Sequence, residues 1–275
     1  MTTLVFSHAN GFPAGTYRKL FQHWRDAGLA VHAVEKFGHD PRFPVTSNWP
    51  HLRNELLQLV EREATEPVFL VGHSLGGYLS LLAAIKRPEL VRGVVMLDSP
   101  LIYGIKAHGV YLFKATGWIG NISPGKISRQ RRTTWASAEE AYAHFAAKPN
   151  FARWDPEVLR DYIASGTEGH DSQHRLVFKR EIETDIYNSI PHHMEALLAR
   201  HPLSMPVAFI AGTTSDEVRQ VGMYATKRLT KGRITWIEGG HLYPFEKPIE
   251  TADTVLHWVR EFEAAAEQVP AGRAA

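Results

Sequence analysis

The chain of 275 residues contains no cysteine. This absence excludes disulfide bonds, a thiolate nucleophile, cysteine-ligated zinc and iron–sulfur clusters. Any nucleophile in this protein must therefore be an oxygen or a nitrogen atom.

An excess of charge of one sign is also absent. Thirty-one Lys and Arg residues balance 29 Asp and Glu residues, which leaves a formal net charge of +2. Proteins that bind nucleic acids usually carry a concentrated basic surface. We therefore expect no nucleic-acid partner and favour a small molecule as the ligand.

Long hydrophobic runs are missing as well. No window approaches 18 uninterrupted apolar residues, and Met1–Phe6 has neither the basic start nor the long apolar stretch of a signal peptide. The hydrophobic content of 44% is that of a globular protein. We expect a soluble, cytoplasmic protein that makes no contact with a membrane and has a sizeable buried core.

Six short runs of apolar, often β-branched residues are present, and helical patterns separate most of them. The runs are Leu4–Phe6, Val31–Val34, Val68–Val71, Val94–Leu97, Val207–Ala211 and Ile234–Ile237. Continuous rather than alternating hydrophobicity is typical of parallel strands that are covered on both faces. The pattern predicts an α/β fold with a doubly wound, mainly parallel sheet of about six strands and with Val31–Val34 at an edge.

The alternation of strands and helices stops between the fourth and fifth runs. Residues 101–199 contain amphipathic stretches, including Ala138–Ala147, Asp155–Ser165 and Pro191–Ala199, but no convincing series of strands. A structureless loop of this length is uncommon in a compact domain. We therefore predict a core of residues 1–100 and 200–267, a helical cap of residues 101–199 and a flexible tail of residues 268–275.

The third run leads directly into Gly72-His73-Ser74-Leu75-Gly76-Gly77, a G-x-S-x-G pattern that is followed by a helix. The bare pattern is weak evidence in a chain with 21 glycines, so its position between a strand and a helix carries the information. A tight turn there projects the serine hydroxyl above the sheet, and the helix directs its positive amino end at a developing oxyanion. This indicates a nucleophilic Ser74; the alternative is a serine that only caps the helix.

Three other segments strengthen a resemblance of the chain to the α/β-hydrolase superfamily. Ser7–Pro13 resembles the His-Gly-x-Pro oxyanion loop of that family, stretched by two residues. Phe37–Asp40 resembles its Gly-His-Gly turn, with aspartate in place of the last glycine. Gly239–Pro248 is similar to its Gly-His-x-x-x-x-Glu-x-Pro segment. The resemblance covers most of the chain and is weakest in the cap. It implies an α/β-hydrolase fold that lacks the usual first hairpin.

The resemblance implies a catalytic triad in the chain order Ser74, an acid and His241. His241 would take the proton from Ser74 and pass it to the leaving group. The oxyanion hole would combine the backbone N–H of Leu75 with that of Asn10, and Gly11 is the alternative to Asn10. His8 is expected to be a structural hydrogen-bonding residue.

Two aspartates compete for the role of the acid. Family topology favours Asp216, although it lies one residue further from the strand Val207–Ala211 than the usual spacing requires. Some family members carry the acid after the preceding strand, where this chain has Asp98. We narrowly prefer Asp216 over Asp98, and Glu238 and Asp40 are weaker alternatives.

These features predict a capped serine hydrolase that cleaves carboxylic esters of small to medium apolar acids through an acyl-enzyme, with no metal and no organic cofactor. A thioesterase, a lactonase, a carbon–carbon bond hydrolase, a perhydrolase or an acyltransferase would use the same residues. A non-catalytic ligand receptor is a further alternative, since a fold alone does not establish activity. We expect a monomer, or a homodimer formed at the exposed edge strand.

A basic run in the cap, Lys126–Arg132, has two interpretations. It can form a solvated surface, or it can recognise an acidic part of the substrate. Aromatic residues of the cap such as Phe151, Trp154 and Tyr162 are expected to pack, with one or two facing an apolar acyl pocket.

Overall fold

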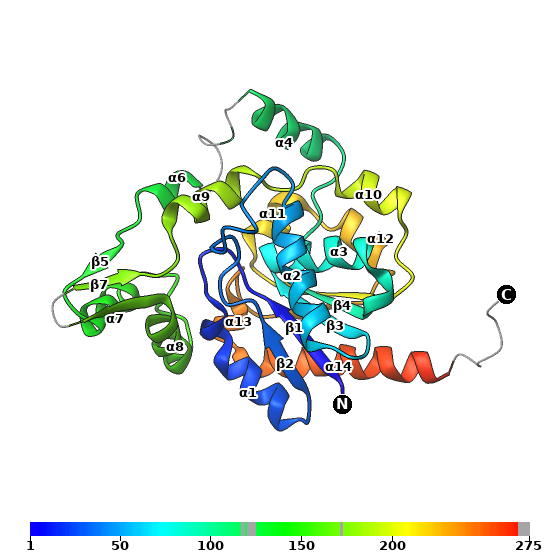
Figure 1. Cartoon of the computed structure of the whole chain (residues 1–275), viewed down its shortest axis with the longest axis horizontal. Helices are drawn as coiled ribbons and strands as arrows, with labels where there is room; N and C mark the ends of the chain where they lie inside the picture. Colours follow the sequence, from blue (N-terminus) through cyan, green and yellow to red (C-terminus); the bar gives the residue numbers. More distant parts are fainter. Residues whose placement is uncertain (117–118, 120–124, 171–172, 269–275) are drawn as a thin grey trace.

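The computed structural model describes residues 1–116, 119, 125–170 and 173–268. A sheet of six parallel strands in the order β2-β1-β3-β4-β8-β9 lies at its centre (Figure 1). The strands are β1 (Thr3–Ser7), β2 (Ala30–Ala33), β3 (Val68–His73), β4 (Val91–Leu97), β8 (Val207–Gly212) and β9 (Ile234–Ile237). The predicted α/β class, the six strands and the edge position of β2 are confirmed.

Helices cover both faces of this sheet. One face packs against α1 (Arg18–Asp26), α13 (Tyr243–Glu246) and α14 (Pro248–Glu267), and the other against α2 (Pro50–Glu63), α3 (Leu75–Lys86) and α12 (Tyr224–Thr230). Within β1, Leu4 and Phe6 belong to the first core and Val5 to the second. Successive strand residues point to opposite faces, so a strand buried on both sides must be apolar throughout. The shorter elements of the core are η1 (Ala14–Tyr17), η2 (Pro88–Leu90) and α11 (Asp216–Val221).

The segment between β4 and β8 forms the cap, which lies beside and above the sheet in Figure 1. Its described helices are α4 (Ile105–Ala115), α6 (Gly125–Arg129), α7 (Ala138–Ala146), α8 (Pro156–Gly166), α9 (Arg180–Asn188) and α10 (Met194–Arg200). The predicted helices correspond to α7, α8 and α10, and α8 begins as expected with Asp155 accepting a hydrogen bond from the Glu157 backbone N–H.

The segment that was predicted as a helical cap also contains a small sheet, which was not anticipated. Strands β5 (Thr134–Trp135), β6 (Thr167–His170) and β7 (Gln173–Leu176) form a small antiparallel sheet in the order β5-β7-β6. Each of these strands has only two to four residues. A strand that short does not repeat its pattern often enough to be recognised in the sequence.

Aromatic side chains join the cap to the core. The ring centroids of Trp154 and Phe245 are 4.4 Å apart, and those of Tyr162 and Phe12 are 5.7 Å apart. An ion pair of 2.7 Å between Arg18 and Asp161 lies at the same junction. The cap helices α7 and α8 therefore share the hydrophobic core of α1 and α14 instead of forming a core of their own.

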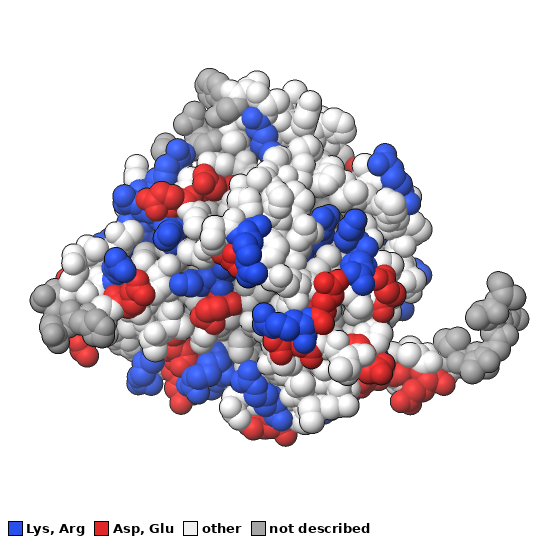
Figure 2. All heavy atoms as spheres, viewed as in Figure 1, with Lys and Arg blue, Asp and Glu red and all other residues white. Residues whose placement is uncertain are grey.

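The surface in view carries interspersed positive and negative charges, apart from a largely uncharged area over α4 (Figure 2). Within the described ranges, no helix is both long and apolar enough to cross a membrane. The expected flexible tail, residues 268–275, lies outside the described residues apart from Gln268.

Candidate active site

Ser74 lies in the sharp turn between β3 and α3, with backbone angles of φ 54° and ψ −112°. The turn depends on glycines, since a Cβ atom at Gly76 would come within 1.9 Å of the carbonyl oxygen of Ser7. A Cβ atom at Gly72 would lie 2.1 Å from the carbonyl oxygen of Gly76. Positive φ at a non-glycine residue is costly and persists only where the surroundings enforce it. The glycines thus permit the close packing that holds Ser74 in this conformation.

Hydrogen bonds from the adjacent strand fix the turn further. The backbone N–H of Ser74 donates to the carbonyl oxygen of Leu97 at 2.9 Å. The hydroxyl of Ser99 donates to the carbonyl oxygen of Ser74 at 2.8 Å. The end of β4 therefore holds both polar groups of the Ser74 backbone.

His241 follows β9, and its Nδ1 lies 2.7 Å from Oδ2 of Asp98. Asp98 is buried, and its carboxylate also accepts hydrogen bonds from the Gly212 backbone N–H at 2.8 Å and from the Ser215 hydroxyl. These hydrogen bonds, from Gly212, Ser215 and the histidine itself, fix the position of the carboxylate. The Nδ1–H of His241 donates to it, which leaves Nε2 as the basic nitrogen.

Asp216, the preferred acid of the sequence analysis, does not reach His241. Its carboxylate is 2.5 Å from the guanidinium of Arg219, and its side chain is 61% exposed. Ser215 is the N-cap of α11, so the chain turns into the helix before Asp216 and directs this side chain to solvent. The structure thus brings Asp98, the alternative at the end of β4, to His241. Glu238 pairs with Lys247 and Asp40 with Arg42 at the surface.

A second carboxylate next to the histidine was not anticipated. Oε2 of Glu217 lies 3.5 Å from Nδ1 of His241. Burial disfavours the charged form of His241, but the hydrogen bond with Asp98 and the negative charges of Glu217 and Asp98 outweigh it and raise the pKa of His241. No motif marks Glu217 in the sequence, because its role depends on the direction in which α11 leaves β8.

The two expected oxyanion donors line the same cavity as Ser74. Leu75 is the first residue of α3, and the first N–H groups of a helix have no partner within it. Asn10 is 5% exposed, and its side-chain amide donates to the carbonyl oxygen of Glu183 at 2.9 Å. Asn10, Leu75 and Ser74 line one small cavity, whereas Gly11 does not. This geometry favours Asn10 over Gly11.

His73, inside the G-x-S-x-G pattern, links three loops of the site. Its Nε2–H donates to the carbonyl oxygen of His241 at 2.9 Å, so its Nδ1 accepts from the hydroxyl of Tyr17 at 2.8 Å. That hydroxyl accepts in turn from the backbone N–H of Ala9 at 3.1 Å. Burial, aided by the charge of His241, holds the pKa of His73 well below its usual range, so the ring stays neutral. One chain of hydrogen bonds therefore joins the loop of Asn10, the turn of Ser74 and the loop of His241.

His8 has the structural role that was expected for it. Its Nδ1–H donates to the carbonyl oxygen of Ala9 at 2.8 Å, and its Nε2 accepts from the backbone N–H of Phe37 at 3.0 Å. Burial lowers the pKa of His8 to about 4, so both bonds persist at neutral pH.

Two cavities meet at Ser74 and His241. The smaller one, of about 110 Å³, has a mainly apolar wall that includes Trp49, Ile102, Ile186, Ile190 and Val221. The larger one, of about 990 Å³, lies between the core and the cap and has a mixed wall of charged, polar and aromatic side chains. The arrangement can hold a substrate with an apolar group on one side of the serine and a bulkier polar group on the other.

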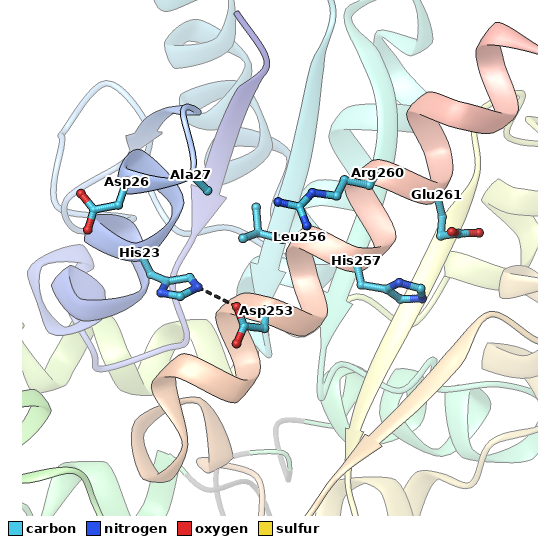
Figure 3. Close-up of a pocket in the computed structure, with 8 residues that line it drawn as sticks. All are labelled: His23, Asp26, Ala27, Asp253, Leu256, His257, Arg260 and Glu261. Carbon is cyan, nitrogen blue, oxygen red and sulfur yellow. Dashed lines mark hydrogen bonds and ion pairs between the residues drawn. The ribbon is translucent and has the colours of Figure 1, made fainter.

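A third hollow lies far from this site, between α1 and α14 (Figure 3). Nε2 of His23 and Oδ1 of Asp253 are 2.7 Å apart there, while His257 and Glu261 lie further along α14. Within the described residues, the potential metal-ligating cluster is instead that of Asp98, Glu217 and His241. The hydrogen bond of 2.7 Å between Asp98 and His241 leaves no room for an ion between these two groups.

Comparison with known proteins shows the family of this chain. The model of the Alpha/beta hydrolase family matches residues 4–254, so the chain belongs to this family of enzymes. The chain is 37% identical over 107 residues to the monoglyceride lipase of Rattus norvegicus, which is 36% of this chain and 35% of the lipase. It is 22% identical over 236 residues to ethanol acetyltransferase 1 of Hanseniaspora uvarum, which is 81% of this chain and 68% of that enzyme. The match thus spans only about a third of the rat lipase.

Solved structures show the same fold. An E-2-(acetamidomethylene)succinate hydrolase superposes with a TM-score of 0.73 at 19% identity and covers 94% of this chain and 91% of its own. The peroxisomal alpha-beta-hydrolase of Saccharomyces cerevisiae superposes with a TM-score of 0.71 at 15% identity, over 96% of this chain and 78% of that one. At such identities the likeness concerns the fold alone.

Proposed function

We propose that this enzyme is a serine hydrolase that cleaves carboxylic esters of small to medium apolar acids, with Ser74, His241 and Asp98 as its triad. The hydrogen bond of 2.7 Å between Asp98 and His241, at a cavity that Ser74 also lines, is the observation that carries the proposal. This choice replaces Asp216 by Asp98 because only Asp98 is both buried and bonded to the histidine.

The reaction follows from the positions of these groups. Nε2 of His241 accepts the proton of the Ser74 hydroxyl while the serine oxygen attacks the acyl carbon. The backbone N–H groups of Leu75 and Asn10 donate to the oxyanion, and Asp98 stabilises the imidazolium. His241 then returns the proton to the departing alcohol, and a water molecule activated by His241 releases the acid from the acyl-enzyme.

The apolar cavity supports the choice of acyl group. Its small volume and its branched aliphatic wall suit a short hydrocarbon chain, which gains free energy by leaving water. The similarity to a monoglyceride lipase and to an ethanol acetyltransferase is consistent with chemistry on an ester carbonyl.

Labelling with a fluorophosphonate tests the nucleophile. We expect covalent modification of the folded protein at Ser74, identified by peptide mass spectrometry, and no modification of Ser74→Ala. A wild-type protein that stays unlabelled while folded would support a non-catalytic ligand receptor instead.

A panel of substrates tests the bond that is cleaved. We expect kcat/KM for p-nitrophenyl esters to be highest for short acyl chains and to fall as the chain outgrows the small cavity. A thioester, a lactone and an alcohol acceptor in the same assay distinguish the thioesterase, lactonase and acyltransferase alternatives. Faster turnover of one of these would replace the ester as the substrate class.

A further inference from the structure

The larger cavity has an uneven distribution of charge. The cap contributes four basic residues to its wall, Arg131, Arg132, Lys148 and Arg153, and one acidic residue, Glu183. The core contributes the acidic residues Asp216 and Glu217, of which Glu217 lies close to His241. A ligand in this cavity therefore meets more positive than negative groups from the cap.

Lys148 is firmly placed in that wall. It follows α7, and its carbonyl oxygen accepts hydrogen bonds of 2.9 Å from the backbone N–H groups of Phe151 and Ala152. Its ammonium nitrogen lies 4.9 Å from the ring centroid of Phe145, and the side chain is half-buried. The aromatic ring orients the cation but does not neutralise it.

The charges around Lys148 do not balance. Arg131 is paired with Glu183 at 2.9 Å and Arg132 with Glu140 at 2.7 Å, whereas no described carboxylate lies within ion-pair distance of Lys148. The guanidinium carbon of Arg131 is 5.7 Å from the same Phe145 ring, so two cations lie near one ring and only Arg131 has a described carboxylate partner.

The pKa values of Lys148 and of its neighbour His144 reflect this excess of positive charge. Burial and the charge of Arg131 lower the pKa of Lys148. Burial, followed by the charges of Lys148 and Arg132, lowers the pKa of the neighbouring His144. A partly buried cation without a counter-ion is destabilising, and an anionic ligand offsets that cost.

We propose that Lys148, together with Arg131, binds an anionic group, a carboxylate or a phosphate, on the alcohol half of the ester. The inference rests on the proposed function, which places the acyl group in the small apolar cavity and leaves the alcohol half to the larger one. Hydrolysis of such an ester breaks the bond between the acyl carbon and the alcohol oxygen. Water supplies the hydroxyl of the acid and the proton of the alcohol, so the products are a short apolar acid and a hydroxylated anion.

Four butyrate esters of substituted phenols test the anion site. They are 4-butyryloxybenzoate, its uncharged amide 4-butyryloxybenzamide, 4-butyryloxyphenyl phosphate and phenyl butyrate. We expect kcat/KM for the carboxylate or the phosphate to exceed that for the amide by about tenfold, because a hydrogen bond to a charged group is stronger than a neutral one. The ratio of the two charged esters shows which anion the site prefers, and the preference should decline as salt is added.

Lys148→Met keeps the length of the side chain and removes its charge. We expect this variant to lower the ratio of charged to amide kcat/KM about tenfold through KM, with the amide ester changed by less than about twofold. Lys227→Met, at an exposed position on α12 outside the cavity, is the matched control and should leave the ratio unchanged. A lysine that only stabilised the end of α7 would lower Tm in Lys148→Met and leave the ratio as it is.

The outcomes separate this inference from the proposed function. Hydrolysis of the amide ester without a preference for either anion would overturn the anion site and leave the esterase intact. If no ester is cleaved and Ser74 is not labelled, the esterase fails, and calorimetry with 4-hydroxybenzoate, 4-hydroxyphenyl phosphate and 4-hydroxybenzamide decides the anion site. Tighter binding of either anion by wild type than by Lys148→Met would support it, and equal binding of all three would overturn it.

Discussion

The core side and the cap side of the site are built from different interactions. The side chain of Asp98 is fully buried and its oxygens accept three hydrogen bonds, whereas the ion pair of Arg132 and Glu140 is nearly half exposed on both sides. Buried networks lose much free energy when one member is removed, while exposed ion pairs contribute little. Under the proposed function, the core side sets the reactivity of Ser74. Changes on the cap side alter the substrate preference and leave that reactivity unchanged.

Asp98→Asn should produce the largest effect. Loss of the buried negative charge removes the partner of the imidazolium and favours the wrong tautomer of His241, so we expect kcat to fall about ten-thousandfold. Asp216→Asn, at an exposed position, is the control and should stay within about twofold of wild type. Steady-state kinetics on p-nitrophenyl butyrate measures both, and the reverse pattern would restore Asp216 as the acid.

His73→Phe tests the chain of hydrogen bonds that joins the three loops. It leaves the carbonyl oxygen of His241 without its donor and the hydroxyl hydrogen of Tyr17 without its acceptor, each at a cost of about 1–3 kcal/mol. Urea denaturation should show that loss in the free energy of unfolding, and kcat should fall about ten- to a hundredfold because His241 is no longer held in place.

Tyr17→Phe is the comparison for this experiment. It breaks the same chain further from His241, so it should lower stability but reduce kcat less than His73→Phe. Equal losses of kcat in the two variants would mean that His73 does not act through His241.

Glu217→Gln tests how the second carboxylate tunes the histidine. The negative charge of Glu217 helps to raise the pKa of His241, so its removal should lower that pKa. The neutral histidine is the active base, and a lower pKa keeps it neutral in more acidic solution. We expect the acid limb of the kcat/KM profile to move to lower pH, with a severalfold gain below neutrality and no change on the alkaline plateau. An unshifted limb would show that solvent screens this charge.

Arg132→Gln should have the smallest effect, and it tests whether the anion site extends to Arg132. Arg132 is exposed and already paired with Glu140, so we expect only about a twofold loss of preference for an anionic ester. The butyrate esters of benzoate and benzamide measure this ratio. A loss as large as that of Lys148→Met would extend the anion site to Arg132.

Much of the fold and part of the site could be predicted because they depend on local patterns. Continuous apolar runs mark strands that are buried on both faces, and glycines around Ser74 mark a turn that tolerates no Cβ atom. The loop of His241 was likewise recognisable from neighbouring residues. The small sheet of the cap was missed because its strands are too short to show an alternating pattern in the sequence.

What the sequence by itself determined is the class of the enzyme, the position of Ser74 on its turn and the loop that carries His241, since each follows from patterns within a few residues. The tertiary structure alone decided between Asp98 and Asp216, for Asp98 and His241 are 143 residues apart and meet only because β4, β8 and β9 are neighbours in the sheet. It also brought Glu217 to the histidine and placed a small apolar cavity and a larger, charged cavity next to Ser74. The residues that follow parallel strands lie at the same edge of the sheet. The order of the strands in the sheet decides which of these residues are neighbours, and no local sequence pattern contains that order.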